Sequence, residues 1–230
     1  MSRPQVVFLF DVDNTLLDND RVTDDLKRHL RETVGHARQE DYWAIFERLR
    51  TELGYADYLG ALQRYRVEHP CDSQVLTVSR FLLNYPFAKR VFPLVLDVVS
   101  QVQQWGTAVI LSDGDVVFQP WKIERAGLFT VVESHVLIYI HKEQELEDVE
   151  RRYPAQHYVV IDDKLRILTA VKQVWGARVT TVFPRQGHYA HDPDVVRRYL
   201  PPDVTIERIG DLLAKDLDGL LAAASPLPVA

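Results

Sequence analysis

Two aspartates near the start of the chain have the side-chain type and spacing that metal-assisted chemistry requires. Asp11 and Asp13 follow directly on an apolar run, residues 6–10. Such an unbroken run predicts a strand buried on both faces, which is typical of a parallel sheet covered by helices. Because side chains alternate in direction along an extended chain, the two carboxylates point roughly the same way where the strand ends. Burying two acids is costly unless a cation meets them, so this pair indicates a metal site.

A second apolar run, residues 107–111, leads into Ser112, Asp113 and Gly114. In open parallel sheets, ligands bind at the carboxyl ends of the strands. A hydroxyl at that position, the backbone N–H groups after it and the start of a helix can together bind an anion. The alternative is that Ser112 only begins a turn and that Asp115 caps the helix.

A third apolar run, residues 158–161, ends at Asp162 and Asp163. Two adjacent acids at the end of a buried strand are poorly explained as a solvated turn, although Asp-Asp-Lys also suits a turn. Lys142 lies just before a predicted helix, where a cation is unfavourable unless an anion is nearby. The ordinary interpretation of Lys142 is a surface lysine. Lys122, within a predicted helix, is the second candidate for a cation at the site.

The elements that must position these residues fall into two groups. Residues 18–89 show helical periodicity and no strand signal: Thr23 is expected to cap the first helix, and Gly35 and Gly54 to stop the first and second. From residue 91 helices alternate with apolar strands, the signature of βαβ units. Strands are expected at residues 107–111, 158–161 and 178–183, with a short strand near 131–132 and a weak one at 204–206. Helices are expected at residues 94–105, 115–126, 143–152, 165–175 and 194–199, and another from residue 209. Residues 225–228 are expected to form a loose tail.

This pattern predicts an α/β protein with a Rossmann-like open parallel sheet and helices on both faces. Residues 1–17 and 90–230 would form this core, and residues 18–89 a small all-helical cap domain. The length of 230 residues accommodates both parts. The net charge of −6 gives no reason to expect nucleic acid or an anionic membrane as a partner. A single cysteine, Cys71, excludes an intrachain disulfide, as expected of a cytoplasmic protein. No run is long enough for a signal peptide or a membrane span. We expect a soluble monomer or homodimer.

Four short motifs resemble, in the correct order, the signature motifs of the haloacid dehalogenase-like hydrolase superfamily. The segment from Phe10 to Leu16 is similar to the first motif, in the Asp-x-Asp-x-Thr form that its phosphatases carry. Ser112 resembles the second motif. Lys142 resembles the third, although no proline follows it as in many members, and Asp162-Asp163 resembles the fourth. The resemblance covers residues 5–17 and 91–210.

The resemblance implies a Mg²⁺-dependent hydrolase of a small phosphate ester. Asp11 would be the nucleophile that forms an aspartyl-phosphate, and Asp13 the acid and base. Ser112 and Lys142, with Asp113 and Gly114, would bind the phosphoryl group. The metal ligands would come from Asp11, Asp13 (through its backbone carbonyl), Asp162 and Asp163, with Asp163 the preferred direct ligand.

Other functions of the same superfamily stay open at this point. These are a phosphotransferase or mutase, another hydrolase, or a non-catalytic binding protein that keeps the fold. Dehalogenases lack the second aspartate, and a phosphonate-cleaving relative needs a Schiff-base lysine, for which the cap region offers only Lys27 and Lys89. Candidates for substrate selection are Arg48, Tyr55, Tyr58, Arg64 and Arg66 in the cap region, and the loop 185–189.

Overall fold

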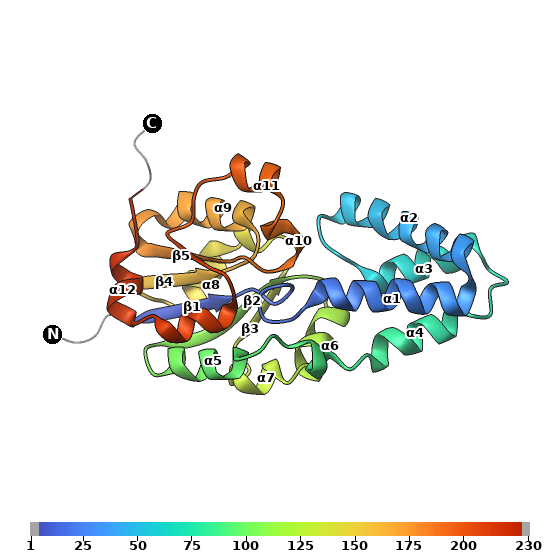
Figure 1. Ribbon diagram of the computed structural model, residues 1–230, viewed down its shortest axis with the longest axis horizontal. Coiled ribbons are helices and arrows are strands. Elements are labelled where there is room, and N and C mark those ends of the chain that lie inside the picture. Colours follow the sequence, from blue (N-terminus) through green and yellow to red (C-terminus); the bar gives the residue numbers. More distant parts are fainter. Residues whose placement is uncertain (1–4, 227–230) are drawn as a thin grey trace.

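The computed structural model describes residues 5–226 and shows one six-stranded, fully parallel sheet (Figure 1). The strand order is β3-β2-β1-β4-β5-β6, so the first strand lies in the middle of the sheet. The strands are β1 (Val6–Phe10), β2 (Thr107–Asp113), β3 (Val136–Tyr139), β4 (His157–Ile161), β5 (Val179–Pro184) and β6 (Val204–Ile206). The predicted α/β class with a parallel sheet is confirmed.

Helices cover both faces of the sheet, and the residues of β1 show why. Val6, Phe8 and Phe10 pack into one core, whereas Val7 and Leu9 pack into another. The first core is completed by α5 (Val95–Gln103) and α12 (Leu217–Ala222), the second by α8 (Leu146–Arg152) and α9 (Leu165–Trp175). Because alternate side chains of a strand point to opposite faces, an entirely apolar strand requires a helical layer on each side.

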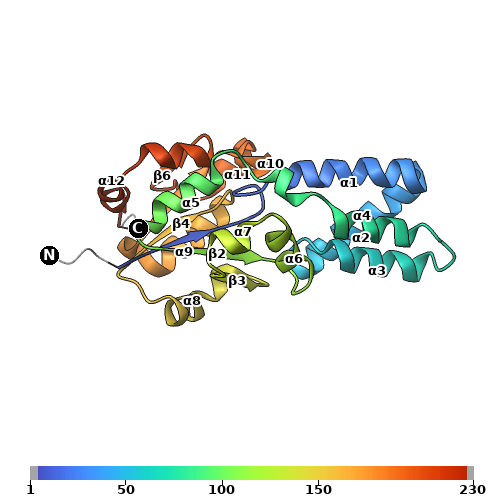
Figure 2. The same ribbon diagram turned by 90° about the horizontal axis from the view of Figure 1, so that it is seen from below.

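Four helices follow β1 and form what we call the helical insert, residues 19–84 (Figure 2). They are α1 (Asn19–Val34), α2 (His36–Leu53), α3 (Tyr58–Glu68) and α4 (Val75–Asn84). Gly35 and Gly54 end the first two as predicted, and Gly54 adopts a left-handed conformation. The predicted cap of the first helix is wrong: Asp18, whose carboxylate accepts from the backbone of Arg21, starts α1 one turn earlier.

The helical insert shares a hydrophobic core with one face of the sheet. Tyr58 of α3 packs edge-on against Phe118 of α6 (Phe118–Arg125), with ring centroids 5.9 Å apart. Phe87, in the 3₁₀ turn η1 (Phe87–Arg90), contacts the same ring at 5.8 Å. These rings are buried, so the insert is fixed against α6. Between residues 5 and 226, no helix combines the length and apolarity that crossing a membrane requires.

Three other expectations fail in the second half of the chain. The strand near residues 131–132 is instead the short helix α7 (Leu128–Val131), because Leu128 and Val132 bury one helical face; β3 begins at Val136. The helix expected from residue 143 begins later, as α8, after a 3₁₀ turn, η2 (Lys142–Gln144). The segment from Ile209 is first a 3₁₀ helix, η4 (Ile209–Ala214). The remaining elements are η3 (Gly176–Arg178), α10 (Gly187–Ala190) and α11 (Pro193–Arg198). Residues 227 and 228 of the predicted tail lie outside the described residues.

Asp203, just before β6, ties the end of the chain to the sheet. Its buried carboxylate lies 2.8 Å from Nζ of Lys172 and accepts from the backbone and hydroxyl groups of Thr181 and Ser225. Burial raises the pKa of Asp203, but these partners outweigh it and hold the pKa below the ordinary value. A lowered carboxyl pKa stabilises the fold at neutral pH, and this contribution is lost as the pH falls through the folded-state value.

We expect Asp203→Asn to lower the free energy of unfolding at pH 7 by about 3–5 kcal/mol, because Lys172 is left buried without its counter-charge. Urea titrations at pH 7 and in acid measure the free energy of unfolding of both proteins. The difference in this free energy between the variant and the wild type should be smaller in acid. Asp194→Asn, which removes an exposed ion pair with Arg197, should change little. Equal losses in the two variants would contradict this account.

Candidate active site

Lys142 joins residues from two strand ends into one buried cluster. Its Nζ lies 2.5 Å from Asp11 Oδ1, after β1, and 2.7 Å from Asp162 Oδ2, after β4. The Lys142 backbone N–H donates to Asp113 at the end of β2, at 2.8 Å. Lys142, Asp11 and Asp162 are all buried. Of the two candidate cations, Lys142 is the one that contacts the predicted nucleophile.

Thr15, which the sequence analysis did not assign, connects the first and fourth motifs. Its hydroxyl donates to Asp11 Oδ2 and accepts from the backbone N–H of Asp163, both at 3.1 Å. Thr15 is fully buried. Because β1 and β4 are neighbours in the sheet, one hydroxyl can fix the relative positions of both acidic segments.

Two nearby lysines, one buried and one half-buried, keep Asp11 ionised. Burial raises the pKa of Asp11, but Lys142 and Lys164 outweigh it and hold the pKa below the ordinary value. Burial and the charge of Asp11 raise the pKa of Asp162 to about 6, against the opposing effect of Lys142. The pKa of Asp163 is raised well above its ordinary value, chiefly by burial, with the charges of Asp11 and Asp162 adding to it. An ionised Asp11 is in the form that a nucleophile needs.

Asp163 shows that this cluster fits a further cation. Both of its carboxylate oxygens are buried and have no hydrogen-bond partner. Oxygens of Asp11, Asp162 and Asp163 lie within 4.8 Å of one another. A buried carboxylate without a partner is strongly unfavourable, and a set of hard oxygen donors suits a divalent cation such as Mg²⁺. The residues present therefore fit the predicted metal.

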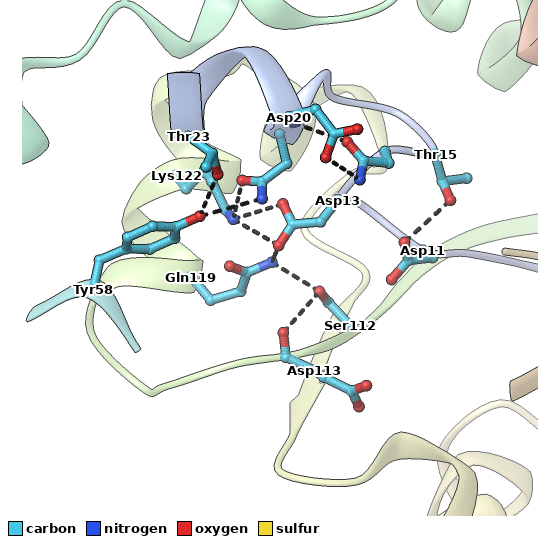
Figure 3. Close-up of polar contacts among 12 residues, drawn as sticks. Asp11, Asp13, Thr15, Asp20, Thr23, Tyr58, Ser112, Asp113, Gln119 and Lys122 are labelled. Atoms are coloured by element: carbon cyan, nitrogen blue, oxygen red, sulfur yellow. Dashed lines mark hydrogen bonds and ion pairs between the residues drawn. The ribbon is translucent and has the colours of Figure 1, made fainter. Parts of the chain in front are cut away.

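Asp13 is held by two residues of α6 (Figure 3). Nζ of Lys122 lies 2.6 and 2.8 Å from the two carboxylate oxygens of Asp13. Gln119 Nε2 lies 2.8 Å from Ser112 Oγ and 3.5 Å from Asp13 Oδ2. The Asp13 side chain is thus engaged by Lys122, and of Asp13 only the predicted backbone carbonyl is left as a metal ligand. Gln119 was missed; two polar residues at i and i+3 beside the apolar Phe118 were the available signal.

The predicted anion site after β2 needs correction. Ser112 is buried, accepts from Gln119 and donates to the Asp113 carbonyl at 3.2 Å. The Gly114 N–H donates to the carbonyl of Tyr139, so it does not bind an anion in this arrangement. The carboxylate of Asp115 accepts from the first N–H groups of α6, as the alternative interpretation held. The Gly114 N–H and the N–H groups of Val117 and Phe118 are therefore engaged within the fold.

A cavity of about 650 Å³ lies between the helical insert and the carboxyl ends of the strands. Asp13, Asp113 and Lys164 line it on the sheet side. From the insert and the loop after β5, the lining includes Lys27, Trp43, Phe46, Glu47, Arg50, Tyr55, Tyr58, His188 and Tyr189.

The cavity lining includes the predicted Tyr55 and Tyr58 and part of the predicted loop. The predicted Arg48 and Arg64 instead form exposed ion pairs with Glu68 and Glu52, and Arg66 is also exposed. Trp43, Glu47 and Arg50 were missed, although their i, i+4, i+7 spacing on α2 forms a second stripe beside the buried one.

Asp163→Asn should abolish stabilisation by Mg²⁺ without lowering the metal-free stability. The substitution replaces an unpartnered buried acid with a neutral side chain, so that no cation is needed to compensate its charge. For the wild type, saturating Mg²⁺ should add about 2–3 kcal/mol at a hundred times the dissociation constant. Thermal unfolding with and without Mg²⁺ measures both effects, and Asp97→Asn, at an exposed position of α5, should keep the response. A Mg²⁺ response that survives in Asp163→Asn would place the metal elsewhere.

Comparisons with known proteins agree with this architecture. No family model and no curated protein matches the chain. A structure from Burkholderia xenovorans, assigned to the haloacid dehalogenase-like hydrolases, is 59% identical, covers 94% of this chain and 99% of its own, and has a TM-score of 0.90. The chain therefore belongs to the haloacid dehalogenase-like hydrolases, as the order of the motifs predicted.

Two more distant structures share the fold. The hydrolase YfnB from Bacillus subtilis, bound to magnesium, is 18% identical with a TM-score of 0.61, over 93% of this chain and 98% of its own. L-2-haloacid dehalogenase from Xanthobacter autotrophicus is 15% identical with a TM-score of 0.60, over 90% of this chain and 96% of its own. This fold is thus found in a dehalogenase as well, and the fold alone does not select the substrate.

Proposed function

We propose that this protein is a Mg²⁺-dependent phosphomonoester hydrolase acting on a small phosphorylated metabolite. The observation that carries the proposal is the unpartnered, buried carboxylate of Asp163 beside Asp11 and Asp162. Attack of a carboxylate on a phosphate dianion needs a cation between two anions, whereas attack on a carbon–halogen bond does not. YfnB, which shares the fold, was observed with bound magnesium, and this supports the same metal here.

Asp11, Asp162 and Asp163, with the backbone carbonyl of Asp13, would hold the ion. When bound, Mg²⁺ supplies the positive charge that offsets the repulsion between the carboxylate nucleophile and the phosphate. Asp11 attacks phosphorus in line, the phosphorus–oxygen bond to the leaving group breaks, and an aspartyl-phosphate remains. Lys142 lies 2.5 Å from Asp11 and would neutralise charge on the transferring group. The Ser112 hydroxyl would turn from the Asp113 carbonyl to donate a hydrogen bond to that group.

Asp13 would exchange protons with the leaving oxygen and with the attacking water. It lines the cavity two residues after Asp11 in the chain, and Lys122 and Gln119 fix its orientation. In the second half of the reaction Asp13 takes a proton from water, the oxygen attacks phosphorus, and inorganic phosphate leaves as Asp11 is regenerated.

The helical insert would act as the cap that covers the site and selects the substrate, with the core formed by residues 1–17 and 90–230. The cavity between insert and sheet supports this role, since lids of this kind exclude water from the reaction. A phosphotransferase would use the same residues but deliver the phosphoryl group to a substrate hydroxyl instead of water.

The test is the release of inorganic phosphate from p-nitrophenyl phosphate, with and without Mg²⁺. The proposal requires release that depends on the metal and on Asp11. If the folded protein releases none, stabilisation by beryllium fluoride with Mg²⁺, a mimic of the aspartyl-phosphate, decides between a selective phosphatase and a non-catalytic protein. Failure to bind beryllium fluoride as well would overturn the proposal. Product analysis with added alcohols identifies a phosphotransferase.

A further inference from the structure

We infer that the substrate carries a second anionic group, such as a carboxylate, which Lys27 of the helical insert binds at the far end of the cavity. This inference rests on the proposed phosphatase function and specifies its substrate class. The observation behind it is a half-buried lysine that faces the cavity without a carboxylate partner.

Lys27 is presented to the cavity over an aromatic ring. Its Nζ lies 4.3 Å from the centroid of the Trp43 ring, and both residues line the cavity. Among residues 5–226, no carboxylate oxygen lies within 4.0 Å of this ammonium group. Asp24, one turn earlier on α1, also lines the cavity but is exposed and makes no ion pair with Lys27.

Two other charged residues of the insert that line the cavity, Arg50 and Asp20, are already paired. Arg50 lies 3.4 Å from Glu47 and donates to the Tyr189 hydroxyl at 2.5 Å. Asp20 pairs with His188 at 2.7 Å. At the sheet end, Asp13 pairs with Lys122. Of the two cations that the helical insert contributes to the cavity lining, Lys27 and Arg50, Lys27 is therefore the one that can bind an anionic substrate group without displacing an existing partner.

The position of Lys27 along α1 sets the length of the substrate. Asn19, Thr23 and Lys27 all line the cavity, at helical spacing. Eight residues at 1.5 Å each place Lys27 about 12 Å from Asn19 along the helix axis. Asn19 Oδ1 lies 3.5 Å from Nζ of Lys122, which binds Asp13. The second anion should therefore lie on the order of 10 Å from the phosphoryl group.

The charge of Lys27 is effective because of its surroundings. The Trp43 ring and the buried Phe46 form an apolar wall beside it, and an ion pair is stronger where water is partly excluded. Binding at Lys27 also places the second anionic group at the insert end of the cavity, away from the acidic cluster of Asp11, Asp162 and Asp163 at the sheet end. A substrate with one uncharged end would leave Lys27 without a partner.

The test compares phosphate esters of ω-hydroxy carboxylic acids of increasing chain length with the corresponding esters whose carboxylate is replaced by a primary amide. For wild type with Mg²⁺, kcat/KM for the carboxylate should exceed that for the amide by about 10- to 100-fold, the usual effect of one charge-assisted hydrogen bond. The advantage should be largest where the extended chain spans about 10 Å, near eight to ten bonds.

Lys27→Met should erase this advantage by lowering kcat/KM for the carboxylate esters to the level of the amides. Arg28→Met is the matched control, because Arg28 is exposed and pairs with Asp25; it should keep the advantage. Equal kcat/KM for acid and amide in the wild type, or an advantage that survives in Lys27→Met, would overturn the inference while leaving the phosphatase intact. Hydrolysis of none of the esters, nor of p-nitrophenyl phosphate, would overturn the proposed function and this inference together.

Discussion

Asp11→Asn should reduce phosphate release by about 10⁴-fold or more, because it removes the proposed nucleophile and with it the proposed covalent route. Asparagine has nearly the same shape as aspartate, and Lys142 keeps its contact with Asp162. The variant should therefore fold, and its loss of activity should be chemical. Removal of one of three buried acids also reduces the repulsion within the cluster.

Acid-quenched enzyme measures the intermediate directly. Wild type mixed with substrate should carry a phosphoryl group on the peptide that contains Asp11, and Asp11→Asn should not. Asp97→Asn, an exposed residue of α5, should retain full activity and phosphoenzyme. Turnover within tenfold of wild type in Asp11→Asn would exclude the covalent mechanism.

Lys142→Met should have the largest effect on stability and a large effect on rate. Nζ of Lys142 is paired with two buried carboxylates, and methionine retains the length of the side chain but not the charge. Leaving those acids buried without this cation should cost about 3–5 kcal/mol of unfolding free energy. Loss of a charge aimed at the transferring phosphoryl group should lower kcat by about 10²–10³-fold. Added Mg²⁺ should restore part of the stability but not the rate.

Lys172→Met separates these two effects. Lys172 is likewise a buried lysine, paired with Asp203 in a network distant from Asp11 along the chain and on the other side of β4 in the sheet. This variant should lose comparable stability, measured by urea unfolding, but keep kcat while folded. If Lys142→Met and Lys172→Met were equally active, Lys142 would have only a structural role.

Much of the secondary structure and of the sheet follows from local patterns in the sequence. The apolar run before Asp11 predicts a strand buried on both faces, and β1 is buried throughout and lies inside the sheet. The runs before Ser112 and Asp162 end at the same edge, because parallel strands place their carboxyl ends together. Helical spacing in residues 19–84 was sufficient to place four helices there. These features depend on the spacing of apolar side chains, which can be read from each segment of the sequence without knowledge of the others.

The tertiary structure decided which groups meet. Lys142 and Asp11 are far apart in the chain, and only the packing of β3 and η2 beside β2 brings the ammonium to 2.5 Å. The rotation of α6 about its own axis directs Lys122 and Gln119 at Asp13. The hydrogen bond from Gly114 to Tyr139 removed a donor that the sequence suggested was free.

The residues that line the cavity were likewise predicted only in part from the sequence. Spacing on α1 and α2 defines stripes of residues, but it does not say which stripe faces the sheet, a helix or solvent. In the folded protein Tyr58 packs against Phe118 of α6, and Lys27 lines the cavity. The sequence by itself therefore determined which side chains stand at the strand ends, because that placement follows from local strand geometry. The partners of each charge depended on contacts between segments that are distant in the chain, and only the tertiary structure specifies those.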